Sequence, residues 1–182
     1  MYGRSTGAPY VRTISTERFS APVPAPEFTI RQIGIVKSEI KTPADDCWAN
    51  LVSEIVLDPA QFTPESTRGL DEFSHVEIVF VFDRVSPEKI FTASRHPRDR
   101  ADYPLVGIFA QRAKDRPNRI GVTTCKIERV DGLHIFVREL DAIDGTPVLD
   151  IKPHIAEFGP REPIRQPAWS QEVMSNYFRA KP

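Results

Sequence analysis

Residues 74–83 alternate between apolar and more polar side chains, and this pattern restricts the fold more than any other. Val76, Ile78, Phe80 and Phe82 would share one face of an extended strand, while the intervening positions, among them a histidine and a glutamate, would share the other. Successive side chains of a β-strand point to opposite faces, so a period of two predicts a strand with one buried face. We therefore expect this segment to cover a hydrophobic core.

Other apolar runs are short, and residues that favour turns separate them. The hairpin dipeptide Asp131-Gly132 joins two of them, and Gly34 predicts a bulge or a close backbone approach. Many short strands with turns between them predict a mainly β fold, either a barrel or a sandwich. The glycines do not form a dinucleotide-binding pattern, which argues against a doubly wound α/β fold. The further strands are expected at residues 28–38, 53–58, 105–111, 120–130, 133–141 and 147–151.

Helices are expected to be few and short, because the chain has 17 prolines in 182 residues. One short helix is predicted within residues 59–70, where Thr63 suits the cap and Pro64 the first helical position. A C-terminal amphipathic helix is predicted at residues 168–180, with Ser170 as its cap. The side chains expected on its buried side are Val173, Met174, Tyr177 and Phe178.

The length suits one domain, which we place at residues 28–182 after a proline-rich N-terminal tail at residues 1–27. The tail is rich in Pro, Ser, Thr and Gly. Such a segment buries too little apolar surface to offset the entropy lost on ordering. Phe19 and Phe28 are its candidate anchors on the domain.

Charge and composition exclude several classes of protein. The formal net charge is −1, so any contact with nucleic acid must come from a local basic patch. Cys47 and Cys125 are too few for a disulfide framework, and the four histidines are too far apart in sequence for a metal motif, so no metal site is expected. No apolar run approaches the ~20 residues of a membrane span. A cytoplasmic location without membrane attachment is expected.

Two stretches, residues 105–122 and 139–154, combine apolar runs with dense charge. An arginine can hold a carboxylate through two parallel hydrogen bonds, and an acid can accept hydrogen bonds from ribose hydroxyls or an amine. Asp144 and Asp150 are candidates for the second role. Alternatively, Asp144 only forms a turn and Asp150 only pairs with Lys152. The first stretch places four cations within eight residues, namely Arg112, Lys114, Arg116 and Arg119.

A long loop at residues 86–103 carries a second basic run. Long loops in compact domains are often functional. We expect this run and the first basic stretch to form a rim that binds RNA; an ordinary solvated surface is the alternative. The residues of this predicted rim are Arg95, Arg98, Arg100, Lys114 and Arg116.

The chain resembles the TrmO/TsaA-like family, also described as YaeB-like or VirR-like. The longest match is Asp-Gly-Thr-Pro-Val-Leu-Asp-Ile-Lys-Pro at residues 144–153, and Gly-Ile-Phe-Ala and Arg-Pro-Asn at 107–110 and 116–118 add to it. Further matches at 33–38 and 68–75 keep the family's order. The resemblance implies a single β-barrel that binds S-adenosylmethionine, forms a homodimer and methylates the exocyclic nitrogen of threonylcarbamoyladenosine in tRNA.

The resemblance also implies the residues that contact the cofactor. This chain departs from the usual pattern, because Trp48 and Ala49 replace a proline and an arginine. The departure keeps two alternatives open: a non-catalytic S-adenosylmethionine-binding regulator, or a methyltransferase with another substrate. No residue stands out as the general base, although one proton acceptor would help an amine attack. The implied cofactor contacts are Trp48, Ala49, Asn50, Asp83, Arg84, Arg112, Val122, Asp144, Asp150, Ile151, Lys152 and Pro153.

Overall fold

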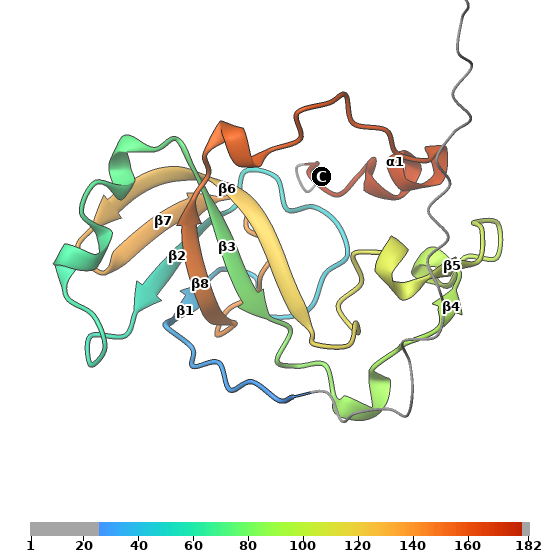
Figure 1. Cartoon of the computed structure of the whole chain (residues 1–182), viewed down its shortest axis with the longest axis horizontal. Coiled ribbons are helices and arrows are strands. Elements are labelled where there is room, and N and C mark those ends of the chain that lie inside the picture. Colours follow the sequence, from blue (N-terminus) through green and yellow to red (C-terminus); the bar gives the residue numbers. More distant parts are fainter. Residues whose placement is uncertain (1–25, 180–182) are drawn as a thin grey trace, which may run out of the picture.

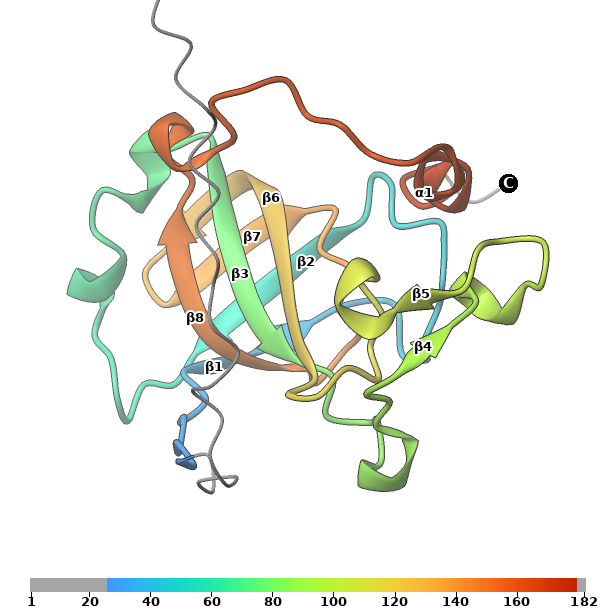
Figure 2. The same cartoon turned by 45° about the vertical axis from the view of Figure 1, so that its right-hand side comes forward.

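Six antiparallel strands close into a barrel in the computed structural model, which describes residues 26–179 (Figures 1 and 2). The strand order around the barrel is β1-β2-β7-β6-β3-β8. Closure leaves no unpaired edge among these strands. The predicted mainly β barrel is thus confirmed. The strands are β1 (Gly34–Lys37), β2 (Val52–Leu57), β3 (His75–Val81), β6 (Ile120–Asp131), β7 (His134–Arg138) and β8 (Pro147–Pro153).

The core lies inside the barrel and is built from the alternating faces of its strands. In β3, Val76, Ile78 and Phe80 are at most 1% exposed, as their alternation predicted. Every other barrel strand adds buried apolar side chains to the same cluster. The turn between β6 and β7 is the predicted Asp131-Gly132 hairpin, and Gly132 has the positive φ, 58°, that such a turn needs.

Gly34 lies where two strand backbones come too close for a side chain. In the pairing of β1 with β2 it stands opposite Leu57. A Cβ at this position would lie 2.4 Å from the carbonyl oxygen of Val56, a distance that Cβ atoms do not tolerate. The close approach predicted from the sequence is therefore confirmed.

We expect Gly34→Ala to lower the free energy of unfolding by about 1–3 kcal/mol, the usual effect of overpacking. The atom that the new methyl would meet belongs to the backbone, so β1 and β2 must move apart. The matched control is Gly107→Ala, since a Cβ there meets no atom within 4 Å. Urea denaturation of both variants checks this, and equal unfolding midpoints would contradict it.

The strand predicted at residues 105–111 is largely wrong. Only β5 (Val106–Gly107) forms a strand there, and it pairs with β4 (Ser94–Arg95) in a separate two-stranded sheet. The chain then turns into the 3₁₀ helix η6 (Ile108–Ala110), which buries Ile108 but leaves Phe109 80% exposed. Burial in this apolar run is thus limited to single side chains and does not follow the alternation of a strand.

The first predicted strand is also shorter than expected, because only β1 is extended within residues 28–38. The predicted loop at residues 86–103 contains β4 and two 3₁₀ helices that begin at prolines. Thr63 and Pro64 occupy their predicted positions, although the Thr63 side chain makes no capping hydrogen bond. The remaining short helices are η2 (Pro64–Thr67), η3 (Leu70–Glu72), η4 (Pro87–Lys89), η5 (Pro97–Asp99) and η7 (Ala156–Phe158).

The C-terminal helix α1 (Ala168–Met174) lies near β4 and β5, on one side of the barrel (Figures 1 and 2). It begins after Pro167, not at the predicted cap Ser170, whose Oγ donates to the Pro167 carbonyl at 2.8 Å. The chain leaves the helix early because residues 176–177 pair with the backbone of residues 47–48. Of the four side chains predicted to be buried, Val173 and Tyr177 are half-buried, whereas Met174 and Phe178 are 40% and 45% exposed.

Most of the predicted tail, including Phe19, lies outside the described residues, and its boundary with the domain stays a prediction. Phe28 is 83% exposed, so it does not anchor the start of the described chain. None of the helices within residues 26–179 has the length and apolar content needed to cross a bilayer.

Candidate functional site

A cavity of about 250 Å³ lies where β3 ends and β8 begins. Phe80 and Phe82 line it with aromatic surface, and their ring centroids are 5.2 Å apart in an edge-to-face arrangement. Ala142, Ile143 and Thr146, which precede or begin β8, form a further part of the wall. Ligand pockets usually measure ~300–1,000 Å³. The cavity therefore suits a ring system or another part of a ligand more than a whole nucleotide-sized molecule.

Charged side chains of both signs surround the aromatic part of this cavity. Such a mixture can bind a ligand that carries both a carboxylate and an amine, because each group finds an opposite charge. The cations that line the cavity are Arg84, Lys89 and Lys114, and the acids are Asp83, Asp115 and Asp141.

Trp48 also lines the cavity and is only 3% exposed. Its indole Nε1 is buried, and no residue in the described part of the chain accepts a hydrogen bond from it. A buried donor without an acceptor costs about 1–3 kcal/mol, so native proteins rarely leave one unless a ligand or water completes the site. The orphan N–H is thus a feature expected beside a binding site.

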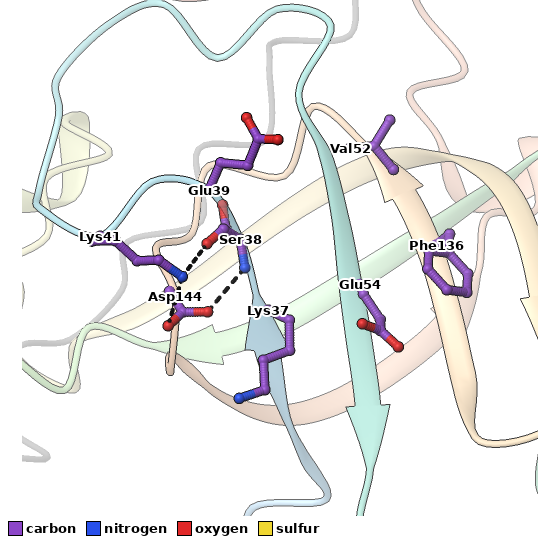
Figure 3. Close-up of a pocket in the computed structure, with 8 residues that line it drawn as sticks. All are labelled: Lys37, Ser38, Glu39, Lys41, Val52, Glu54, Phe136 and Asp144. Atoms are coloured by element: carbon purple, nitrogen blue, oxygen red, sulfur yellow. Dashed lines mark hydrogen bonds and ion pairs between the residues drawn. The ribbon is translucent and has the colours of Figure 1, made fainter.

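Asp144 lies beside the cavity and holds the surrounding loops together. Its carboxylate accepts a hydrogen bond from the Ser38 amide at 3.1 Å and pairs with Lys41 at 3.0 Å (Figure 3). Arg84 donates to the carbonyls of Asp144 and Lys41, at 3.0 and 2.7 Å. The Ser38 amide and the Lys41 ammonium hold the pKa of the Asp144 carboxyl below its ordinary value. Asp144 therefore has the turn-forming role that the sequence analysis gave as the alternative to cofactor binding.

Asp144 also borders an open groove of about 650 Å³ on the outside of the barrel (Figure 3). Lys37, Glu54 and Phe136 stand in one row across β1, β2 and β7 and form its floor. The Glu54 carboxylate oxygen Oε1 lies 2.6 Å from Nδ1 of His134. The groove is shallow, and charges of both signs lie along it, so it has no clear preference for one class of ligand.

A second group of predicted cofactor residues lies on the outer face of the barrel. Arg112 is exposed, and its guanidinium donates a hydrogen bond to the carbonyl of Val122. Val122 and Asp150 both stand opposite Val79, so they share one row across β6, β3 and β8. The pairing of β3 with β8 shifts register at this row, and such irregularities are common next to functional sites.

The predicted cofactor contacts therefore divide into two groups. Trp48, Asp83 and Arg84 line the cavity, and Asp144 adjoins it. Ile151 is half-buried and packs against the barrel core. Ala49 and Asn50 follow Trp48 but do not line the cavity. The outer-face group consists of Arg112, Val122, Asp150 and Lys152, and Asp150 pairs with Lys152. Pro153 stands opposite the buried Val76 of β3, so it belongs to the inner face of the barrel.

The predicted RNA-binding cations mostly face carboxylates. Arg95 forms two hydrogen bonds of 2.5 Å with Asp115, and Arg98 forms two of 2.7 Å with Asp46. Arg100 similarly pairs with Asp102. These ion pairs join loops around the cavity and leave the rim less positive than the sequence indicates. The remaining contacts are Lys114 with Asp45 at 3.3 Å, and Arg116 with the Gln111 carbonyl at 3.4 Å.

Two cavity features were missed by the sequence analysis: Asp141 as a lining acid, and Tyr177 as its partner. The Asp141 carboxylate accepts hydrogen bonds from the hydroxyls of Thr123 and Tyr177. Burial, and next the charge of Asp141, raise the pKa of the Tyr177 hydroxyl. The only sequence signal was the proximity of Asp141 to the Asp-Gly turn. Within residues 26–179, no three His, Cys, Asp or Glu side chains gather in a way that could hold a metal ion.

Residues 35–159 match the model of the family described as tRNA-methyltransferase O N-terminal domain. The chain belongs to this family. Members of the family carry different descriptions. A human tRNA (adenine(37)-N6)-methyltransferase is 39% identical over 61% of this chain but only 25% of its own length. A probable S-adenosyl-L-methionine-binding protein of Pyrococcus abyssi is 33% identical over 74% of this chain and 72% of its own.

Solved structures of the tRNA-methyltransferase O family support the same assignment. A crystal structure of TrmO from Pseudomonas aeruginosa superposes with a TM-score of 0.61 and 25% identity, covering 76% of this chain and 61% of that chain. Another TrmO crystal structure gives a TM-score of 0.60 at 27% identity. The chain thus spans about a quarter of the human relative's length and about three fifths of the solved chains. The relatives are described either as tRNA methyltransferases or as probable S-adenosyl-L-methionine-binding proteins.

Proposed function

We propose that this protein is an S-adenosylmethionine-dependent methyltransferase that acts on the exocyclic nitrogen of threonylcarbamoyladenosine in tRNA. The observation that carries the proposal is the cavity within the family-matched region, lined by Trp48, Asp83 and Arg84. All three belong to the cofactor contacts that the family resemblance implies. We also propose a cytoplasmic location.

The chemistry of the cavity fits parts of such a cofactor. Phe80 and Phe82 offer an apolar surface for an adenine ring, and Arg84 can bind a carboxylate. The indole N–H of Trp48 supplies a hydrogen-bond donor that has no acceptor within the described residues. When bound, the sulfonium cofactor supplies an already activated methyl group, so alignment of the acceptor nitrogen accounts for much of the rate. The role of the protein is then to orient both partners and to exclude water.

The separation of the two residue groups supports a homodimer as part of the proposal. The cavity is too small for a cofactor together with a modified nucleoside. Arg112 and Val122 lie on the outer barrel face, where Val122 is 39% exposed. In a homodimer the outer face of one subunit can add its contacts to the cavity of the other. The rim residues, led by Arg116, are then proposed to contact the tRNA backbone.

The deciding experiment measures transfer of labelled methyl from S-adenosylmethionine to two tRNA preparations, with and without the threonylcarbamoyl group. Transfer only to the modified tRNA is the expected result. Equal transfer to both would indicate a methyltransferase with another acceptor. Transfer to neither would reject the proposed function.

A non-catalytic S-adenosylmethionine-binding protein is the second candidate, and one observation favours it. Trp48 and Ala49 replace the residues usual at this position, and the Trp48 indole fills part of the cavity wall. The relative from Pyrococcus abyssi is described only as a probable S-adenosyl-L-methionine-binding protein. Cofactor binding in calorimetry without methyl transfer to either tRNA would support this candidate.

A further inference from the structure

We propose that Asp141 is a catalytic residue that takes up the proton released during methylation, and that Thr123 and Tyr177 are positioning residues that hold its carboxylate. The inference rests on the proposed function, because it needs a methyl-accepting nitrogen that carries a hydrogen, in or next to the cavity. Asp141 lines that cavity and is half-buried.

Three separate elements fix the Asp141 carboxylate. Asp141 itself follows β7, Thr123 lies within β6 with 9% of its surface exposed, and Tyr177 follows α1. The Thr123 hydroxyl donates to Oδ1 and the Tyr177 hydroxyl donates to Oδ2. The Tyr177 carbonyl also accepts a hydrogen bond from the Trp48 amide at 2.9 Å. Tyr177 of the C-terminal segment therefore contacts two cavity residues, Asp141 through its hydroxyl and Trp48 through its carbonyl.

The hydrogen-bond pattern leaves Asp141 able to accept a further proton. Each hydroxyl has only one hydrogen, and both hydroxyls use it on Asp141. A carboxylate has about four lone-pair sites, so two remain for other donors. Because Thr123 and Tyr177 are neutral, they orient the carboxylate without cancelling its charge. This is the arrangement needed in a general base.

The other acids that line the cavity are less suited to this role. Asp115 is held by Arg95 through two hydrogen bonds of 2.5 Å, and although burial raises the pKa of Asp115, the guanidinium brings it below its ordinary value. Asp83 is exposed to solvent. Asp141 alone among the three combines partial burial with neutral hydrogen-bond partners.

The charged groups around Asp141 come from every neighbouring element. Arg84 and Lys89 follow β3 and line the same cavity, as does Lys114. Glu139 is close in sequence, and Cys125 lies on the same strand as Thr123. Arg98 and Arg112 act electrostatically on Tyr177, lowering its pKa against the dominant effect of burial. The charged groups around the site therefore carry both signs.

The proton balance of the step is simple. The acceptor nitrogen of threonylcarbamoyladenosine carries one hydrogen. Its lone pair forms the new N–C bond with the methyl carbon, and the electrons of the C–S bond remain on the donor sulfur, which becomes a neutral thioether. The N–H electrons stay on nitrogen, and the proton passes to a free lone pair of the Asp141 carboxylate. A positioned general base of this kind typically contributes 10²–10⁴-fold.

The first test is Asp141→Asn, which keeps the shape and one of the two acceptor oxygens but cannot take up the proton. We expect unchanged affinity for S-adenosylmethionine in calorimetry and for tRNA in filter binding, but single-turnover methyl transfer slower by about 100-fold or more. An undiminished rate overturns the proposal. Loss of cofactor or tRNA affinity also overturns it, since Asp141 would then be a binding residue. A wild-type protein that transfers no methyl overturns the proposed function and this inference together.

The second test is Tyr177→Phe, which removes one hydroxyl and keeps the ring. A hydrogen bond to the ionised carboxylate favours that form, so its loss makes protonation easier. We expect the acid limb of the pH–rate profile to move to higher pH, with cofactor affinity unchanged. A merely structural role of Tyr177 would lower the rate at all pH values without moving the limb, and that result would overturn the inference. This profile also decides the question if Asp141→Asn does not fold.

Discussion

Replacing Arg112 by alanine is expected to weaken S-adenosylmethionine binding about tenfold or more while the protein stays folded. Arg112 is exposed, and its one hydrogen bond in the described structure goes to the Val122 carbonyl. The other guanidinium N–H groups are thus available to a carboxylate. Loss of a charge-assisted hydrogen bond costs about 1.5–3 kcal/mol, which corresponds to a tenfold or greater change in affinity. Calorimetry measures the affinity, and thermal unfolding checks the fold.

Arg129→Ala is the matched control. Arg129 is also an exposed arginine, but it lies within β6 near the end of that strand. Its guanidinium carbon lies 4.1 Å from the centroid of the Phe136 ring, and its side chain pairs with Asp131. We expect its loss to leave cofactor affinity unchanged. A similar loss of affinity in both variants would indicate a general effect of surface charge and would argue against Arg112 as a cofactor contact.

The barrel could be predicted because its strands carry their own pattern. In β3 the buried positions Val76, Ile78 and Phe80 alternate without interruption, and the Asp131-Gly132 turn fixes where β6 meets β7. These signals depend on neighbouring residues only. They were therefore readable without any knowledge of long-range contacts, and the barrel followed from them and from the family resemblance.

The geometry of the site could not be read in the same way, because it depends on contacts between distant residues. Tyr177 reaches Asp141 across 36 positions, and Arg98 reaches Asp46 across 52. A single sequence shows that a chain has both charges but not which ones meet. The sequence predicts an RNA-binding surface at residues 95–100 but does not show that Arg95, Arg98 and Arg100 each pair with a carboxylate. RNA binding by this run stays a prediction.

The strand predicted at residues 105–111 was largely wrong for a different reason. Its apolar run is compatible with either a strand or a short turn of helix, and periodicity cannot separate them over so few residues. The structure buries Ile108 and exposes Leu105 and Phe109, so each side chain has its own environment. The resemblance names Arg112 and Val122 separately as cofactor contacts, and the structure shows that the Arg112 guanidinium donates to the Val122 carbonyl.

Replacing Ile78 by alanine is expected to have the largest effect on stability, about 2–5 kcal/mol of the free energy of unfolding. Ile78 is fully buried at the middle of β3, where it stands opposite Thr123 of β6 and Ile151 of β8. The closed barrel cannot easily collapse onto the lost methyl groups, because hydrogen bonds on both sides hold β3 in register. Domains are stable by only about 5–15 kcal/mol, so this loss would be a large fraction of the total. Urea denaturation measures it.

Val79→Ala is the control on the same strand, because Val79 points to the outer face, opposite Val122 and Asp150. We expect it to lower the free energy of unfolding by less than about 1 kcal/mol. Equal losses from both variants would mean that the outer face is as closely packed as the core, for example against a second subunit. Since Ile78 also stands opposite Thr123, its loss should loosen the Asp141 carboxylate and slow methyl transfer, whereas Val79→Ala should leave this internal contact intact.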